Sequence, residues 1–237
     1  MKFIKKQKNT KGYYELLDLK RKGGDYSHLK NDVSKNSYIK DEVVTSLLEE
    51  QGYICAYCMR SIDLKSTTIE HIVGQNYDDG TQKGKDLQLD YDNFLAVCKG
   101  DSCRDELHCD KSRANYQKTR PLYATPLKSQ ITKHLKYTNS GEIYFKNYVE
   151  KTEIGKNKHH LKHSDDENIQ YDISYVLNLN CHNLKEERKS VISVLKRITK
   201  NYSDKKQINK LYEKYSLEDK KYTQFSEVIL YTLNRKL

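Results

Sequence analysis

The spacing of the cysteines constrains the fold of this chain more than any other feature. Cys55 and Cys58 form a CxxC pair, and Cys98, Cys103 and Cys109 follow some forty residues later. Two cysteine groups separated by a loop are typical of a structural zinc site, because a short hairpin lets two thiolates converge on one tetrahedral ion. In a reducing compartment such cysteines are metal ligands more often than disulfide partners. The sequence therefore predicts one structural Zn²⁺ that joins two distant segments.

The charge balance favours a polyanionic partner. The chain has 43 Lys and Arg against 33 Asp and Glu, a formal net charge of +10. Such a surplus is typical of nucleic-acid binding, although a solvated Lys-rich surface gives the same balance. No stretch approaches the run of about 20 apolar residues that a membrane span requires, and the basic N-terminus is followed by no apolar segment. We therefore expect a cytoplasmic protein with no membrane partner.

Hydrophobic patterning predicts an α+β fold with a helical majority. Expected helices cover residues 38–51, 104–118, 183–200, 204–215 and 218–235, and expected strands cover 67–73 and 141–151. Asn183 and Glu186 match a capping box, and residues 155–168 have the composition of an exposed loop. Pro121 and Pro126 bracket the clearest break, a predicted hinge. Three parts are expected: an N-terminal arm (1–37) that is a candidate for partner contact, a central module (38–120) and a mixed, then helical C-terminal region (121–237).

Residues suited to phosphodiester hydrolysis lie between and beside the cysteines. Glu70 and His71 are adjacent, Asn93 precedes Cys98, and Asp110 follows the last cysteine of the second group. A neutral histidine can deprotonate water near pH 7, and Mg²⁺ or Mn²⁺ prefers carboxylate oxygens. An acid–histidine pair alone is weak evidence. The order CxxC, acid–histidine, Asn and second cysteine group is much more specific.

That order resembles the HNH endonuclease family, whose core is a zinc-stapled ββα-metal fold. The stretch "IEHIVGQ" matches its first motif and "NFLAVC" its second. The resemblance implies that His71 is the general base, that Glu70 and Asp110 hold a catalytic divalent ion, and that Asn93 orients the histidine loop. Residues 38–120 are then the nuclease module.

Further segments resemble a narrower group, the PtuB-like HNH subunits of bacterial Septu-type and retron-associated anti-phage systems. These segments are "LLEEQGYICAYCMRSI", "LDYDNFLAVCKG", "HCDKSR" and "VLNLNCHNLKEERK". The resemblance implies a bacterial defence effector that works with a PtuA-like ATPase, and in some systems with a retron reverse transcriptase and its RNA–DNA product. DNA is the favoured substrate, with RNA or tRNA as the alternative.

The third motif departs from the family pattern and leaves the fourth zinc ligand open. Cys103 precedes Arg104, which cannot bind a cation, whereas Cys109 precedes Asp110, which can. This register favours Cys109 as the ligand, with Cys103 as a spare thiol. His108 remains a rival to Asp110 at the catalytic ion.

Two cations and one competing function complete the predictions. Lys111 and Arg113 fall on the same expected helix as Asp110 and are candidates for phosphate contact, with solvated helix charges as an equal alternative. The competing function is a non-catalytic module, zinc-stapled, that binds nucleic acid or assembles with the ATPase. Such a module has no use for Glu70 beside His71, so the sequence favours the nuclease.

Overall fold

The computed structural model describes residues 1–30, 37–81, 83–100, 106–116, 120–146, 164–202, 204–216 and 221–236. Cys103 and Arg104 lie outside these residues, as does the 155–163 part of the predicted loop.

Helices outnumber strands in the described part, and the predicted α+β class is confirmed. The strands are β1 (Thr67–His71), β2 (Phe94–Cys98), β3 (Leu135–Tyr137) and β4 (Ile143–Phe145). The N-terminal and central helices are α1 (Lys11–Arg21), α2 (Ser27–Lys30), α3 (Ser37–Gln51), η1 (Tyr91–Asn93), α4 (Cys109–Ala114) and α5 (Ser129–Thr132). The C-terminal helices are α6 (Asp165–Tyr171), η2 (Asp172–Val176), α7 (His182–Ile198), η3 (Thr199–Asn201), α8 (Lys205–Ser216) and α9 (Ser226–Asn234).

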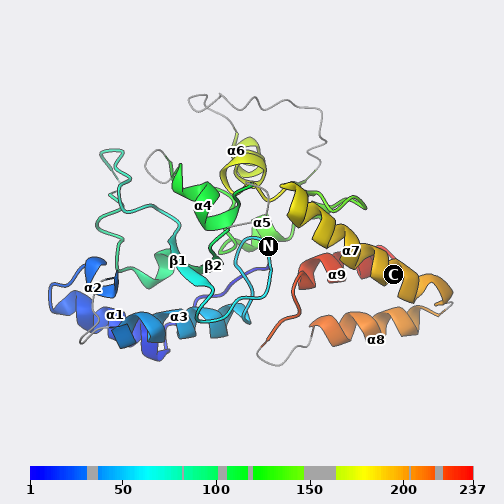
Figure 1. The fold of residues 1–237 in the computed structure, drawn as a ribbon, viewed down its shortest axis with the longest axis horizontal. Coiled ribbons are helices and arrows are strands. Elements are labelled where there is room, and N and C mark those ends of the chain that lie inside the picture. Colours follow the sequence, from blue (N-terminus) through cyan, green and yellow to red (C-terminus); the bar gives the residue numbers. More distant parts are fainter. Residues whose placement is uncertain are drawn as a thin grey trace.

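A two-stranded antiparallel sheet lies at the centre of the N-terminal half, between α3 and α4 (Figure 1). Its register runs from Thr67 opposite Cys98 to His71 opposite Phe94. Residues 94–97 of β2 are buried, so the strand that leads to Cys98 is a rigid core element. The second sheet, β3–β4, is also antiparallel.

Helix α3 follows the sequence prediction closely. Its apolar stripe, made by Val43, Val44, Leu47 and Leu48, is buried. The helix stops at Gly52, whose φ of +63° is costly for other residues, and a Cβ there would lie 2.2 Å from the Tyr222 ring.

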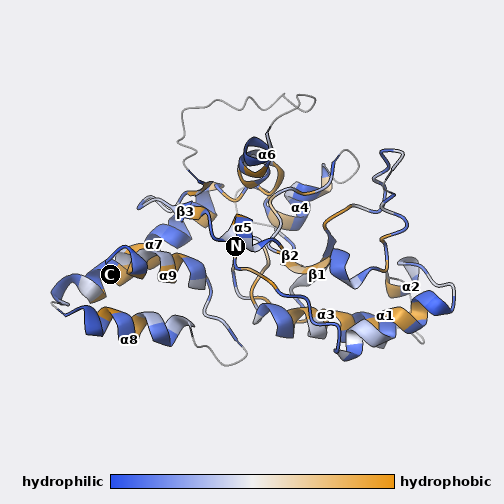
Figure 2. Cartoon of the chain, turned by 180° about the vertical axis from the view of Figure 1, so that it is seen from behind, coloured by the Kyte–Doolittle hydropathy of each residue, from blue (hydrophilic) through white to orange (hydrophobic). Residues whose placement is uncertain are grey.

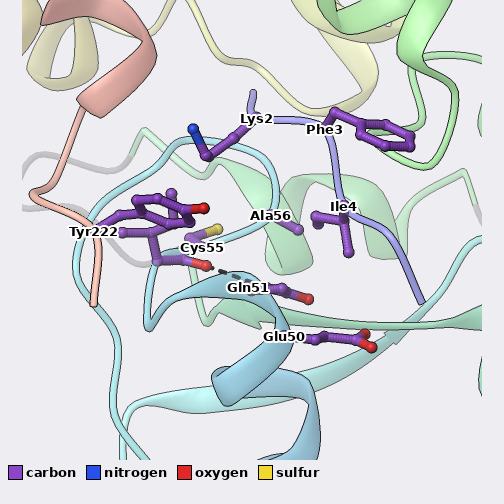
Figure 3. A pocket seen from close by; sticks show the side chains of 9 residues that line it. Lys2, Phe3, Ile4, Glu50, Gln51, Cys55, Ala56 and Tyr222 are labelled. Carbon is purple, nitrogen blue, oxygen red and sulfur yellow. Dashed lines mark hydrogen bonds between the residues drawn. The ribbon is translucent and has the colours of Figure 1, made fainter. Parts of the chain in front are cut away.

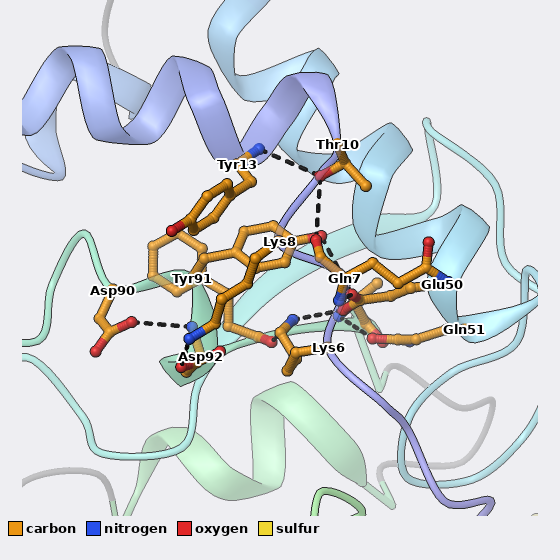
Figure 4. A network of polar contacts seen from close by, with 12 residues as sticks. Lys6, Gln7, Lys8, Thr10, Tyr13, Glu50, Gln51, Asp90, Tyr91 and Asp92 are labelled. Carbon is orange, nitrogen blue, oxygen red and sulfur yellow. Dashed lines mark hydrogen bonds and ion pairs between the residues drawn. The ribbon is translucent and has the colours of Figure 1, made fainter.

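The first residues of the chain pack along the sheet instead of projecting from it. Lys6 Nζ forms an ion pair with Glu50, donates to the Phe94 carbonyl at 2.9 Å and lies 4.0 Å from the centroid of the Tyr91 ring (Figure 4). This strap fixes the start of β2. Partner contact by the predicted N-terminal arm stays a prediction.

The predicted hinge at residues 121–126 is part of the core. Leu122, Ala124 and Thr125 are buried, and the Leu122 amide donates to the Ile72 carbonyl at 3.2 Å. These contacts connect the two halves of the molecule, so the segment is not an exposed linker.

Three sequence predictions about helix starts, those of α6, α7 and α9, are wrong. The predicted loop 155–168 contains the start of α6, where Ser164 and Glu167 form a reciprocal capping box. The N-cap of α7 is Cys181, so Asn183 lies inside the helix and makes no capping box. Helix α9 begins at Ser226, later than expected, because the chain before it crosses the surface near Gly52.

Helices α7, α8 and α9 form a unit with its own small core. Leu195, Ile208, Ile229 and Leu233 are buried together. The outer sides of α7 and α8 are mostly hydrophilic, whereas apolar residues concentrate on α9 (Figure 2). Within the described ranges, none of the helices combines the length and apolar character needed to cross a bilayer.

Candidate metal centre and active site

Four cysteine sulfurs gather at one point, as the sequence predicts. The Sγ atoms of Cys55, Cys58, Cys98 and Cys109 all lie within 4.8 Å of one another. The Cys55–Cys109 and Cys58–Cys98 separations are 3.9 and 3.7 Å. A tetrahedral ion with Zn–S bonds of about 2.3 Å has edges of about 3.8 Å, whereas a disulfide requires about 2.05 Å. The four sulfurs can therefore hold a metal ion such as zinc.

The chemistry of the thiols also calls for a cation. Burial raises the pKa of the Cys109 thiol well above its usual value, and the neighbouring sulfurs raise it further. Four thiolates cannot share so small a buried volume unless a positive ion offsets their charge. An all-sulfur tetrahedral set is typical of zinc or iron–sulfur centres.

Local turns place the first pair of sulfurs. The Cys55 amide donates to the Arg60 carbonyl at 2.8 Å, and the Met59 amide donates back to the Cys55 carbonyl at 3.0 Å. Gln51 at the end of α3 donates to the Ile54 carbonyl at 3.1 Å (Figure 3) and to the Ala96 carbonyl at 2.8 Å. The Gln51 side chain thus ties the CxxC turn to β2. The cavity of about 30 Å³ beside it has room for little more than a water molecule.

A glycine places the second pair. Gly100 has a φ of +77°, and a Cβ there would lie 1.6 Å from the His108 carbonyl oxygen. The His108 amide donates to the Gly100 carbonyl at 3.0 Å. Only glycine allows this close approach, which brings Cys109 back beside Cys98.

The cluster contains Cys109, the cysteine that the register argument favours, whereas Cys103 lies outside the described residues. Cys181 is buried elsewhere in the core, as expected for a small apolar side chain. His108 Nδ1 lies 3.2 Å from Cys109 Sγ, and its Nε2 lies 3.1 Å from Arg60 Nη1. Because Arg60 can only donate, Nδ1 of a neutral His108 carries the proton and donates to the sulfur. His108 thus supports the thiol cluster, and these contacts do not favour its rival role as a ligand of a catalytic ion.

Glu70 and Asp110 come together from β1 and α4. Glu70 is 1% exposed, and its carboxyl group and that of Asp110 share a side-chain hydrogen bond. Burial raises the pKa of Glu70 well above its usual range, Arg113 opposes the shift, and Asp110 adds to it. Two adjacent carboxyl groups in so dry a place either share a proton or bind a cation.

Arg113 does not fit its predicted contact with nucleic acid. It is 0% exposed, its Nε lies 3.6 Å from Glu70 Oε1, and Nη2 donates to the Ile72 carbonyl at 3.1 Å. The buried Glu70 carboxyl group requires a nearby cation, and Arg113 supplies it. Lys111 is exposed on the same helix, so its predicted phosphate contact remains a prediction.

His71 is held at the end of β1, with only 6% of its surface exposed. Its Nε2 lies 3.1 Å from the Gln88 carbonyl oxygen, and its ring meets Tyr26 and Phe94 edge-on, at centroid distances of 4.6 and 4.7 Å. A carbonyl only accepts, so Nε2 of a neutral His71 carries the proton and Nδ1 has the lone pair. The imidazole is therefore fixed in orientation, and the contact with the Gln88 carbonyl, shorter than the 3.5 Å contact of Nε2 with the Gln75 amide nitrogen, favours the proton on Nε2.

Tyr26 connects the histidine with the two carboxyl groups. Its ring contacts His71, and burial, followed by the negative charges of Glu70 and Asp110, raises the pKa of its hydroxyl. Sequence reasoning missed Tyr26 because it lies far upstream of the motifs. No local pattern marks the tyrosine as part of this site.

Asn93 joins the site through the backbone. Its side-chain amide pairs with both the amide and the carbonyl of Val73, two residues after His71, and also donates to the Leu87 carbonyl at 3.2 Å. The position suits the expected role of orienting the histidine loop.

Comparison of the sequence with models of known protein families and with curated proteins found no match. Function must therefore be inferred from the residues themselves.

Proposed function

We propose that this chain is a metal-dependent HNH-type endonuclease, and that it acts as the nuclease effector of an anti-phage complex with an ATPase partner. The observation that carries the proposal is the juxtaposition of the buried carboxyl group of Glu70 and the half-buried one of Asp110 with Tyr26, whose ring contacts His71. The order strand, strand, helix around this group supports an HNH-like core. The four-thiol cluster between β2 and α4 supports the structural zinc.

Each residue has a role in hydrolysis. His71 accepts the proton of the attacking water at Nδ1, while its Nε2–H donates to the Gln88 carbonyl, which stabilises the imidazolium that forms. Glu70 and Asp110 are the residues that would hold Mg²⁺ or Mn²⁺, which supplies Lewis-acid stabilisation of the charge on the leaving oxygen. Arg113 partly balances the charge of Glu70 and fixes its orientation. Asn93 keeps the loop after His71 in register.

The DNA preference and the defence context rest on the sequence resemblance. The test is to incubate the zinc-loaded chain, alone and with an ATPase encoded beside it, with labelled plasmid DNA and with total tRNA. We expect cleavage of DNA that requires Mg²⁺ or Mn²⁺ and is lost in His71→Ala. His134→Ala is the matched control, because His134 is exposed and lies on another element.

The nuclease and the non-catalytic module predict different results. Cleavage at the wild-type rate by His71→Ala would refute the assignment of the base. Tight binding without cleavage under every metal and partner condition would favour the non-catalytic, zinc-stapled module.

A further inference from the structure

Helices α7 and α8 and the turn between them carry many cations and few acids. Residues 189–214 contain eight Lys and Arg and two acidic residues, a net charge of +6. All eight cations are exposed: Lys189, Lys196, Arg197, Lys200, Lys205, Lys206, Lys210 and Lys214. These eight residues are named the α7–α8 basic face below.

Charge alone does not distinguish this face, but the pairing of its charges does. Residues 1–30 have the same net charge, with nine Lys and Arg against three acids. Five of those nine form ion pairs: Lys2, Lys6, Lys8, Lys11 and Lys22. Judged over the described residues, Lys196, Arg197, Lys200 and Lys210 have no carboxylate within ion-pair distance, whereas Lys189 pairs along its own helix with Glu186. These four charges are thus available to an external anion.

The cations form continuous rows. Lys206, Lys210 and Lys214 recur every four residues on α8, a row of about 12 Å. Lys196 and Lys200 are likewise one turn apart at the end of α7. Helix α9 packs between α7 and α8, so both rows are carried by one rigid unit (Figure 1).

The aromatic residues of the unit indicate which kind of polyanion fits. Tyr202, Tyr212 and Tyr215 pack against the Leu195–Ile208 core and so are not aligned outward as a platform for bases. Proteins that bind single strands combine cations with exposed stacking aromatics. Rows of cations without such a platform suit the phosphates of a duplex, contacted without base readout.

We propose that the α7–α8 basic face binds the sugar–phosphate backbone of duplex nucleic acid independently of sequence. The inference rests on the proposed function in one respect: if the chain is a nuclease, the bound duplex is the substrate of the His71 site. The face supplies affinity, while cleavage belongs to β1 and α4.

The test measures binding without divalent cations, so that no cleavage occurs. A fluorescein-labelled DNA duplex of about 20 base pairs is titrated with the full chain between about 50 and 200 mM salt. We expect the triple variant Lys200→Gln, Lys206→Gln, Lys210→Gln to bind at least about tenfold more weakly at the lower salt, and its log–log salt slope to fall by about 2 to 3. The matched control is Lys5→Gln, Lys128→Gln, Lys133→Gln, which removes three exposed cations elsewhere and is expected to change affinity less than about threefold.

Conservative substitution guards against misfolding. The triple variant Lys200→Arg, Lys206→Arg, Lys210→Arg keeps the charge and should retain wild-type affinity. Equal losses in both Gln triples, or no loss in the first, would overturn the proposal. So would equally strong competition by single-stranded DNA, or by poly-glutamate, which would identify a single-strand site or an acidic protein partner. Binding and cleavage are measured in separate experiments. A chain that binds duplex DNA through this face but does not cleave it would therefore refute the proposed nuclease function and leave the binding proposal standing.

Discussion

Asn93 pairs with both backbone groups of Val73: its Oδ1 accepts from the Val73 amide at 2.8 Å, and its Nδ2 donates to the Val73 carbonyl at 3.0 Å. Both residues are buried. One side chain thus closes the loop between β1 and β2 as a backbone pair would. The position of His71 at the end of β1 depends on that closure.

Replacing Asn93 with Ala should therefore destabilise the chain by about 2 to 3 kcal/mol, because the amide and carbonyl of Val73 would remain buried without partners. Urea denaturation monitored by circular dichroism measures the loss. Asn139→Ala is the control, since Asn139 is exposed on the turn between β3 and β4. Equal stability of the two variants would contradict the structural role of Asn93.

The thiol cluster predicts one bound zinc ion per chain. Cys109→Ser should abolish stoichiometric zinc and lower the thermal midpoint, because one ligand of four is lost. Cys181→Ser also removes a buried thiol but lies outside the cluster, so it should keep its zinc. Metal content by mass spectrometry of purified protein gives the answer. Full zinc in Cys109→Ser, with none in Cys103→Ser, would identify Cys103 as the fourth ligand instead.

The buried pair of Arg113 and Glu70 predicts that the arginine matters for folding. Arg113→Met should cost about 3 to 5 kcal/mol, because Glu70 would lose its buried counterion. Lys111→Ala on the same helix is exposed and should change stability by less than about 0.5 kcal/mol. Chemical denaturation of both variants tests this, and near-wild-type stability of Arg113→Met would show that the pair contributes little.

Features with a local cause could be predicted from the sequence. The cluster of Cys55, Cys58, Cys98 and Cys109 follows from thiol spacing and from the identity of the residue after each candidate cysteine. Helix α3 follows from one apolar stripe ended by Gly52, which needs a positive φ. The order of the neighbouring motifs also singles out Glu70 and His71 in the sequence, and their catalytic role stays a prediction.

Features that depend on distant packing could not be predicted. Arg113 looked like a surface cation, and only the buried Glu70 from another element explains its position. Tyr26 reaches His71 from the segment between α1 and α2, which no periodicity reveals. The start of α6 escapes prediction for another reason: its capping residues Ser164 and Glu167 are polar, and a polar composition is also typical of a loop.

Asp172 is a buried acid that should make stability depend on pH. Its Oδ2 accepts from the backbone amides of Tyr123 and Ala124, and its Oδ1 lies 3.0 Å from Arg120 Nη2. Burial nevertheless raises its pKa to about 6, above the usual 3.8, with Arg120 opposing the shift. The folded state therefore holds this proton more tightly than the unfolded state. The resulting stabilisation is complete below pH 3.8 and is lost as the pH rises through about 6.

Asp172→Asn removes the titration while keeping an acceptor for the two amides. We expect the free energy of unfolding of the wild type, relative to that of the variant, to fall by about 2 to 3 kcal/mol between pH 4 and pH 7. Urea denaturation of both proteins at several pH values across this range measures the difference. The contributions of most other titrating groups are the same in the two proteins and cancel. A difference that stays constant, or that grows with pH, would show that Asp172 is ionised in the folded state throughout, and that its partners outweigh its burial.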